Sequence, residues 1–313
     1  MEETIDKMQH WSLDRKISYS IKVLTDFKQQ TNKNMVVMFS GGKDSTVLLH
    51  LCRTIYPDIK AVFVNTTNEF TEIIKFVKRI ENVDIIKPNK TFLHTVTKYG
   101  FPIISKKVSR AINTLKNPTS RNQNTRNLLL TGVNRKGKKG SSYKLANKWK
   151  FLIDAKFNLT YNCCDILKHK PAEKYHKQNN VNPILGTMAT ESETRRMNYI
   201  RFGNNILGDN PKSRPLSIWT EEDIWNYIDK YNVDYCPIYD DLKDKKGNVI
   251  CKGEKRTGCA FCSFGLHLEK PDNLGMKRFD RLKIREPKRY IQQMELKNNG
   301  VTYKQAIDKI LNQ

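Results

Sequence analysis

The sequence predicts an α/β fold with a doubly wound parallel sheet, followed by a helical, cysteine-rich C-terminal part. In roughly the first 90 residues, short apolar segments of strand character alternate with helical segments, an order that forms parallel sheets. The chain has 313 residues, of which 38% are hydrophobic, enough for a large core. It contains no run of about 18 apolar residues, so no membrane-spanning helix is expected.

Hydrophobic periodicity places the first elements of this sheet. Residues 14–30 carry apolar side chains at helical spacing, and residues 34–39 form a short apolar run typical of a buried parallel strand. A glycine-rich turn comes next. The same pattern then predicts helices over 46–56 and 70–80 and strands over 59–64 and 83–86.

The second half of the chain is predicted to be mainly helical. Helices are expected over 165–179, 191–199, 220–231, 279–296 and 303–311, with a short strand before Gly186. Thr220 is the expected N-cap of its helix, because Asp223 follows at the position that completes such a cap. We divide the chain into an α/β core over 1–106, an insertion over 107–153, the rest of the core over 154–235 and a cysteine-rich end over 236–313.

The charge of the chain is strongly positive. It has 56 Lys and Arg against 32 Asp and Glu, a net charge of +24. Such a surplus attracts polyanions over long distances, although a general abundance of Lys in the source organism's proteins would have the same effect on composition. The N-terminal residues lack the pattern of a secretion signal, so a cytoplasmic protein without membrane association is expected.

The positive charge is concentrated in one segment. Residues 85–153 contain 16 Lys or Arg and no Asp or Glu. The middle of the segment is rich in Asn, Ser, Gly and Lys, which predicts a mobile basic insertion rather than core. Tyr143, Trp149 and Phe151 lie among the charges. These rings would suit stacking on nucleic-acid bases, or they pack back into the fold.

The glycine-rich turn after the first strand is a candidate phosphate site. Its residues are Ser40, Gly41, Gly42, Lys43, Asp44 and Ser45. Glycines let backbone amides approach an anion, the following helix offers free N–H groups, and Lys43 can neutralise phosphate charge. The spacing differs from that of the Walker loop.

This segment, Ser-Gly-Gly-Lys-Asp-Ser, resembles the PP-loop of ATP pyrophosphatases, whose fold is that of the adenine nucleotide alpha hydrolases. The resemblance implies that ATP, with Mg²⁺, binds here, and that an adenylyl group is transferred to a substrate. It also implies catalytic roles for Lys43 and Asp44.

Two further segments resemble the phosphoadenylylsulfate (PAPS) reductase family. The segment with Asn65 and Thr66 follows the second strand, where nucleotides bind in open α/β sheets. Gly186, Glu191 and Arg195 match the Gly-x-Arg-Ala-x-Glu-Ser-x-x-Arg pattern of that family, so these five residues are expected at the nucleotide. A plain loop at 65–66 and an ordinary helix salt bridge between Glu191 and Arg195 remain as alternatives.

Four of the seven cysteines form a candidate metal site. Cys163 and Cys164 are adjacent, and Cys259 and Cys262 form a Cys-x-x-Cys pair. An adjacent pair chelates one tetrahedral ion poorly but can reach two irons of a cluster, which favours a 4Fe–4S cluster over zinc or unligated thiols. The pattern resembles that of assimilatory adenylylsulfate reductases and of DNA phosphorothioation sulfurtransferases. A disulfide framework is a poor interpretation of an odd cysteine count.

The remaining cysteines have different expected roles. Cys251 stands between lysines and glycines, so an exposed thiolate with a lowered pKa that relays sulfur is one hypothesis. Cys52 and Cys236 are expected in the core.

Three functions follow from the motifs. The first is an ATP-dependent sulfurtransferase that acts on nucleic acid, DNA or tRNA, with a sulfur donor protein such as a cysteine desulfurase as a partner. The second is a PAPS or adenylylsulfate reductase, against which we count the absence of a cysteine after Cys262. The third is a non-enzymatic iron–sulfur nucleic-acid binder with a nucleotide-sensing loop. A homodimer is compatible with each of them. The first function requires that the four thiols meet and that the glycine turn stays open.

Overall fold

The computed structural model describes residues 4–140 and 143–312. Its centre is a six-stranded sheet in the order β3-β2-β1-β5-β7-β6. The strands are β1 (Asn34–Met38), β2 (Ala61–Val64), β3 (Val83–Ile86), β5 (Val181–Leu185), β6 (Asn205–Ile206) and β7 (Lys212–Ser213). All neighbours pair in parallel except β6 and β7. The predicted parallel α/β fold is confirmed, with one antiparallel edge strand added.

The described helices cover this sheet and build the C-terminal part. In the first half they are α1 (Ile5–Met8), α2 (Leu13–Gln30), α3 (Lys43–Ile55), α4 (Thr71–Val77), α5 (Phe92–Tyr99), α6 (Lys106–Lys116) and α7 (Gln123–Thr131). In the second half they are the π-helix η4 (Asp165–His169), α8 (Lys170–Asn179), α9 (Glu193–Phe202), α10 (Glu221–Tyr231), α11 (Arg278–Arg285), α12 (Pro287–Met294) and α13 (Tyr303–Leu311).

The order of the strands places the site. The chain builds β1, β2 and β3 outward on one side, and then crosses β1 so that β5 pairs along the whole of its other side, from Asn34 opposite Val181 to Met38 opposite Leu185. Strand order therefore reverses between β1 and β5. Ligands of open α/β sheets bind at the carboxyl ends of the strands at such a switch point.

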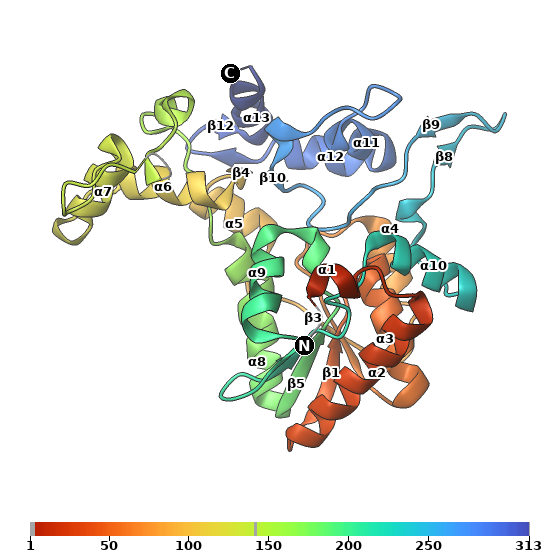
Figure 1. Cartoon of the computed structure of the whole chain (residues 1–313). Helices are drawn as coiled ribbons and strands as arrows, with labels where there is room; N and C mark the ends of the chain where they lie inside the picture. The colour runs from red at the N-terminus through yellow and green to blue at the C-terminus, as the bar shows by residue number, and fades with distance from the viewer. Residues whose placement is uncertain (1–3, 141–142, 313) are drawn as a thin grey trace.

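A buried ion pair joins the helices on one side of the sheet, where α2, α3 and α10 lie together (Figure 1). Lys16 of α2 is 2% exposed, and its Nζ lies 2.6 Å from Oδ2 of Asp223 in α10 and 2.7 Å from the carbonyl oxygen of Gln9. The same carboxylate accepts from the amide and hydroxyl of Thr220, which confirms the predicted N-cap.

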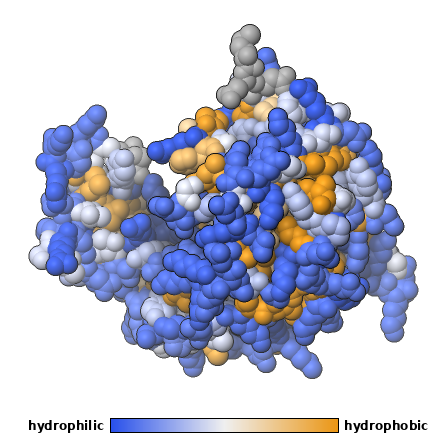
Figure 2. All heavy atoms as spheres, turned by 90° about the horizontal axis from the view of Figure 1, so that it is seen from below, coloured by the Kyte–Doolittle hydropathy of each residue, from blue (hydrophilic) through white to orange (hydrophobic). Residues whose placement is uncertain are grey.

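The insertion over 107–153 is more helical, and its ends are more buried, than the sequence predicted. Ile112 of α6 and Leu152 are fully buried, and Trp149 is 5% exposed with its ring against His267. The middle, which contains α7, projects from the body (Figure 1) and forms a separate lobe when the molecule is seen from below (Figure 2). Tyr143 is exposed in this arm. Trp149 is thus a core residue, because the arm returns to the body there.

The C-terminal part packs against the start of this arm. Strand β10 (Ser263–Phe264) pairs with β4 (Ile103–Ile104), and the hydroxyl of buried Tyr303 donates to the carbonyl of Phe261. The short hairpins β8 (Leu242–Lys243) with β9 (Val249–Cys251) and β11 (Lys297–Asn298) with β12 (Val301–Thr302) complete it.

One predicted helix is divided. The helix expected over 279–296 is two helices that meet at Glu286, because Pro287 disfavours a helical conformation at the residue before it. Along the described parts of the chain, no helix has the length and apolar character needed to cross a membrane.

The buried pair predicts a stability effect. The Lys16→Met variant should lose about 3 kcal/mol of unfolding free energy, because the Asp223 carboxylate would stay buried without its counterion. Urea unfolding measures this loss. Lys22→Met on the exposed face of α2 is the matched control and should change stability by less than about 0.5 kcal/mol. Equal effects of the two substitutions would contradict the role given to the pair.

Candidate functional site

Hydrogen bonds of its own serines fix the conformation of the glycine turn. Gly41 has a φ of 71°, a left-handed conformation that favours glycine. The hydroxyl of Ser45 accepts from the Ser40 amide at 3.1 Å and donates to the Gly42 carbonyl at 2.9 Å. Helix α3 begins at Lys43, directly after this turn. The turn therefore presents the first amides and the positive dipole end of α3 at the carboxyl end of β1.

Gly186 brings the end of β5 against this turn. A Cβ atom at Gly186 would lie 3.2 Å from the carbonyl oxygen of Asp44 and 3.3 Å from Cα of Ser45, both backbone atoms that cannot rotate away. Gly186 is thus needed for the close approach of β5 and α3. The two strands that flank the switch point meet at this glycine.

Residues from the C-terminal part cover one side of the turn. The amide of Lys43 donates to the hydroxyl of Tyr239 at 3.0 Å, and that hydroxyl also contacts the hydroxyl of Thr257 at 3.0 Å. A Cβ atom at Gly42 would lie 2.7 Å from Thr257 Oγ1. The turn is therefore covered on this side, because the 236–258 segment folds back over it, and the predicted requirement of an open turn is met only on the other side.

A small cationic pocket remains beside the turn. It has a volume of about 250 Å³ and is lined by the turn together with Gly186, Lys43, Arg195 and Arg256. Nζ of Lys43 lies 3.1 Å from Glu221 and 3.5 Å from Asp44. Three cationic side chains around backbone amides form a site for a pyrophosphate-sized anion. Arg256, three residues before Cys259 in the sequence, lines this pocket.

Asp44 has the character of a cation ligand. Its Oδ1 is buried and has no hydrogen-bond partner, and burial raises the pKa of its carboxyl group, against the opposing effect of Lys43. Mg²⁺ binds to proteins through one or two carboxylates together with substrate phosphates. This oxygen makes no hydrogen bond and is held by a 3.5 Å ion pair to Nζ of Lys43, so it fits the Mg²⁺ that ATP brings, with Asp44 as its protein ligand.

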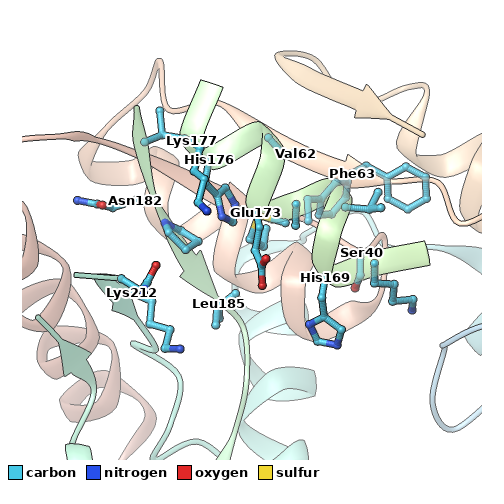
Figure 3. A pocket seen from close by; sticks show the side chains of 18 of the residues that line it. Ser40, Val62, Phe63, His169, Glu173, His176, Lys177, Asn182, Leu185 and Lys212 are labelled. Atoms are coloured by element: carbon cyan, nitrogen blue, oxygen red, sulfur yellow. Dashed lines mark hydrogen bonds between the residues drawn. The ribbon is translucent and has the colours of Figure 1, made fainter. Parts of the chain in front are cut away.

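A larger cleft extends from the same turn. Its volume is about 850 Å³, and it runs over β1, β2 and β5 from Ser40 toward Glu69 and Lys168. Figure 3 shows His169, Glu173 and His176 from η4 and α8 along this cleft, with Leu185 and Lys212 among the other lining residues. Parallel sheets are ordinarily covered on both faces, so apolar strand surface left open here is available to a flat ligand such as adenine.

The far end of the cleft reaches the cysteines. Gly258, which precedes Cys259, lines the cleft, and Thr66 Oγ1 lies 3.9 Å from Cys259 Sγ. Burial lowers the pKa of Lys168, but its interactions with Cys259, Glu69 and Cys164 outweigh this effect, and the pKa of Lys168 is raised. Lys168 therefore stays charged between the nucleotide cleft and the thiols.

The four predicted ligand cysteines come together. Each of the other three thiols acts on the pKa of Cys163, which is raised chiefly by its hydrogen bond with Cys164. That same hydrogen bond, with Lys106 and Lys168, lowers the pKa of Cys164 to about 5 in spite of burial. Burial raises the pKa of Cys259 to about 12 and raises that of Cys262. Among these four cysteines, Cys164 is the one that favours the thiolate form, and the other three would lose their protons on binding metal.

The donor set fits an iron–sulfur cluster in its chemistry. Four thiols and two lysines meet there, and thiolate is the ligand of such clusters. Across residues 4–140 and 143–312, no three His, Cys, Asp or Glu side chains are already arranged around a point that could hold a single metal ion. The side chains would need to turn toward a bound group.

Hydrogen bonds attach the Cys-x-x-Cys segment to the end of β2. The amide of Ala260 donates to the carbonyl of Asn68 at 2.6 Å, and the amide of Phe261 donates to the Asn68 side chain at 3.2 Å. Thr66 donates to Glu69 at 2.7 Å, and Asn65 accepts from the amide of Thr67. Asn65 and Thr66, predicted at the nucleotide, thus shape the loop to which the Cys-x-x-Cys segment is attached, and neither lines the cleft or the anion pocket.

The hypothesis about Cys251 is wrong in its physical basis. Cys251 is fully buried in β9, its thiol contacts the carbonyl of Arg281, and burial raises its pKa. It has neither the exposure nor the lowered pKa of a sulfur relay. Cys52 and Cys236 are fully buried, as predicted.

Glu191 and Arg195 combine the two roles that the sequence left open. Glu191 accepts from the amide of Met188 at 2.8 Å and pairs with Arg195, while Arg195 lines the anion pocket. The Glu191–Arg195 salt bridge thus also positions the guanidinium group of Arg195 at the anion pocket. Tyr239, Thr257 and Glu221 were not predicted, since only tertiary contacts bring them to the turn.

The sequence matches the phosphoadenosine phosphosulfate reductase domain over residues 34–102 and 85–263, which include the glycine turn and all four clustered cysteines. The chain belongs to this family. Its PP-loop is the turn described above, and the expectation of a PP-loop enzyme is confirmed. The family places the chain among sulfur-related PP-loop enzymes.

Curated relatives agree with this family. Sulfate adenylyltransferase subunit 2 of Vibrio atlanticus is 29% identical over 218 residues, which cover 68% of this chain and 62% of that protein. An uncharacterized protein of Methanocaldococcus jannaschii is 23% identical over 263 residues, which cover 82% of this chain and 48% of that protein. The chain therefore spans about half to three fifths of the length of these relatives.

Solved structures of the superfamily are more distant. PAPS reductase from Candida auris, in a phosphate complex, has 14% identity and a TM-score of 0.39, with 80% of this chain and 98% of that chain covered. The U34-tRNA thiolase NcsA from Methanococcus maripaludis, with its 4Fe–4S cluster, has 15% identity and a TM-score of 0.38, with 71% and 65% covered. These similarities are too weak to carry an argument about activity.

The packing at Gly186 predicts a binding defect. Gly186→Val should weaken the binding of pyrophosphate at least roughly tenfold, because overpacking against backbone costs about 1–3 kcal/mol and moves α3 away from β5. Isothermal titration with pyrophosphate measures the affinity. Gly140→Val is the control, since a Cβ atom there makes only ordinary contacts of 3.4 Å or more with the Tyr143 ring. An unchanged affinity in Gly186→Val would contradict the packing role.

Proposed function

We propose that this chain is an ATP-dependent, adenylating sulfurtransferase that acts on nucleic acid. One observation supports the proposal above the others, namely that a single cleft runs from Ser40 of the PP-loop to Lys168 and Gly258 beside the thiols. An activated acceptor in this cleft would lie within reach of a sulfur held by the cysteines. The net charge of +24 and the basic arm suit a polyanionic acceptor.

The first step is adenylation. An acceptor oxygen, such as a base carbonyl, attacks the α-phosphorus of ATP, the bond to the bridging oxygen breaks, and pyrophosphate leaves while the acceptor releases a proton. Lys43, Arg195 and Arg256 stabilise the charge that develops on pyrophosphate. Asp44 would hold Mg²⁺ at the same place.

The second step is displacement. Hydrosulfide-level sulfur from a donor attacks the activated carbon, AMP leaves with the oxygen, and the hydrosulfide proton stays on the product. Lys168 lies where it can attract both the sulfur anion and the phosphate of AMP. A 4Fe–4S cluster on Cys163, Cys164, Cys259 and Cys262 would supply a site that holds the sulfur before transfer.

ATP turnover tests the adenylation step. Wild-type protein should release AMP and pyrophosphate from ATP, and single-stranded DNA or tRNA should stimulate the release and acquire sulfur, which mass spectrometry of nucleosides detects. Asp44→Asn should lower the rate about 100-fold or more, because it removes the metal ligand. Asp58→Asn, at an exposed carboxylate, is the control.

Two outcomes would replace the proposal. Thiol-dependent reduction of adenylylsulfate or PAPS without ATP would assign the chain to the reductases. ATP binding without turnover in the presence of every acceptor would favour a nucleotide sensor.

Metal content tests the thiol site separately. Protein purified without oxygen should contain iron and sulfide, and Cys259→Ser should lose most of both, because a thiolate ligand is removed. Cys251→Ala should keep the wild-type iron content, since Cys251 lies against Arg281 instead. A colourless protein that carries zinc would contradict the cluster and leave a structural metal site.

A further inference from the structure

A second cavity lies behind the helix that lines the nucleotide cleft. It has a volume of about 830 Å³ and is bounded by the loop after β3, the end of α5 and the outer face of η4 and α8. Six of its side chains carry the argument that follows, and they are Lys87, Lys90, Lys170, Lys174, Tyr99 and Tyr175. We call it the lysine cavity.

One helical segment separates the two cavities. Lys168, Ala172 and His176 face the nucleotide cleft, whereas Lys170 and Lys174 line the lysine cavity. Residues of a helix four positions apart share a face, which explains how Lys170 and Lys174 present two charges on the same side. The positive charge of Lys170 therefore lies at this cavity, and that of Lys168 lies at the thiols.

The charge of the lysine cavity is unbalanced. Four lysines line it, and Asp165 is the one lining carboxylate among the described residues. Asp165 is also shared with His169, 4.0 Å away. Among residues 4–140 and 143–312, no carboxylate lies within 4.0 Å of any of the four lysine nitrogens. The four positive charges repel one another, and a bound anion would lower the electrostatic energy of this repulsion.

Two tyrosines stand among these charges in fixed positions. Nζ of Lys90 donates to the Tyr99 hydroxyl at 3.0 Å, and the Tyr175 hydroxyl donates to Asp84 at 2.6 Å. Ordered aromatic rings beside lysines are the combination that binds single-stranded nucleic acid, because bases stack on the rings while phosphates contact the cations.

The lysine cavity adjoins the reaction centre along the chain. Asn162 lines it and directly precedes Cys163, and Asp165 directly follows Cys164. Its other wall, Ile86 to Lys90, is the beginning of the acid-free segment 85–153, with its 16 Lys and Arg. Four lysines spread along a cavity of about 830 Å³ match an extended polyanion better than an isolated phosphate.

We propose that the lysine cavity binds the phosphodiester backbone of the acceptor nucleic acid, with a base against Tyr99 or Tyr175. The inference rests on the proposed function and specifies its substrate class. The strand backbone would thus lie on the face of α8 opposite to the one that ATP occupies, and the target base would reach into the nucleotide cleft beside the thiols. The basic arm would extend the contact beyond the cavity.

Equilibrium binding of a labelled strand tests the inference. The Lys87→Gln/Lys174→Gln variant should bind fluorescein-labelled single-stranded DNA and RNA about tenfold more weakly at 0.1 M salt. The negative slope of log affinity against log salt should become shallower by about 1.4, since each lost phosphate contact removes about 0.7 from its magnitude. Fluorescence anisotropy between about 50 and 200 mM salt measures both values. The affinity of the cavity variant for pyrophosphate should stay at the wild-type value.

A matched variant controls for net charge. Lys245→Gln/Lys246→Gln removes the same two charges from an exposed hairpin turn and should keep the wild-type slope. Equal losses in the two variants, or no loss in the cavity variant, would overturn the inference. So would displacement of the strand by polyglutamate as readily as by unlabelled strand, which would point to an acidic protein.

The binding test is independent of catalysis. Strand binding at the lysine cavity without any ATP turnover would support the inference while the proposed function fails. Turnover on a small acceptor, with no strand bound, would keep the adenylating activity and overturn the inference.

Discussion

The attachment of the Cys-x-x-Cys segment to the end of β2 is the constraint on which the site depends. Two amides, of Ala260 and Phe261, donate to Asn68, and these contacts bridge more than 190 positions of the chain. Together with the pairing of β10 and β4, they fix the position of the later pair of thiols relative to the nucleotide cleft. Because a buried amide left without an acceptor costs about 1–3 kcal/mol, the arrangement is strongly favoured over a detached segment.

Charge is arranged along the site in a definite order. Arg195, Arg256 and Lys43 surround the anion pocket, and Lys168 stands between the cleft and the thiols. Asp44 and Glu191 are carboxylates in the same pocket; Glu191 pairs with Arg195, and Asp44, whose Oδ1 makes no hydrogen bond, is the candidate cation ligand. A cleft that is cationic at both ends suits a substrate with negative charge at both ends, such as a nucleotide opposite an anionic sulfur.

Local patterns predicted most of the elements. The strand over 83–86, the capped helix after Thr220 and the helix over 303–311 match the structure to within a residue, because apolar periodicity and capping are short-range properties. The errors arose where the tertiary structure acts. The burial of Cys251, and the choice between the two alternatives for Trp149, depend on partners far along the chain, and the antiparallel strand β6 is too short to give a sequence pattern.

The sequence by itself determined the parallel α/β core, the PP-loop and the four cysteines, since each is a compact pattern whose chemistry follows from residue type and spacing. Only the tertiary structure decided that Tyr239 and Thr257 cover one side of the turn, that Arg256 serves the anion pocket, and that α8 separates two cavities. These are contacts between segments far apart in the chain, and neither periodicity nor composition specifies which distant surfaces meet.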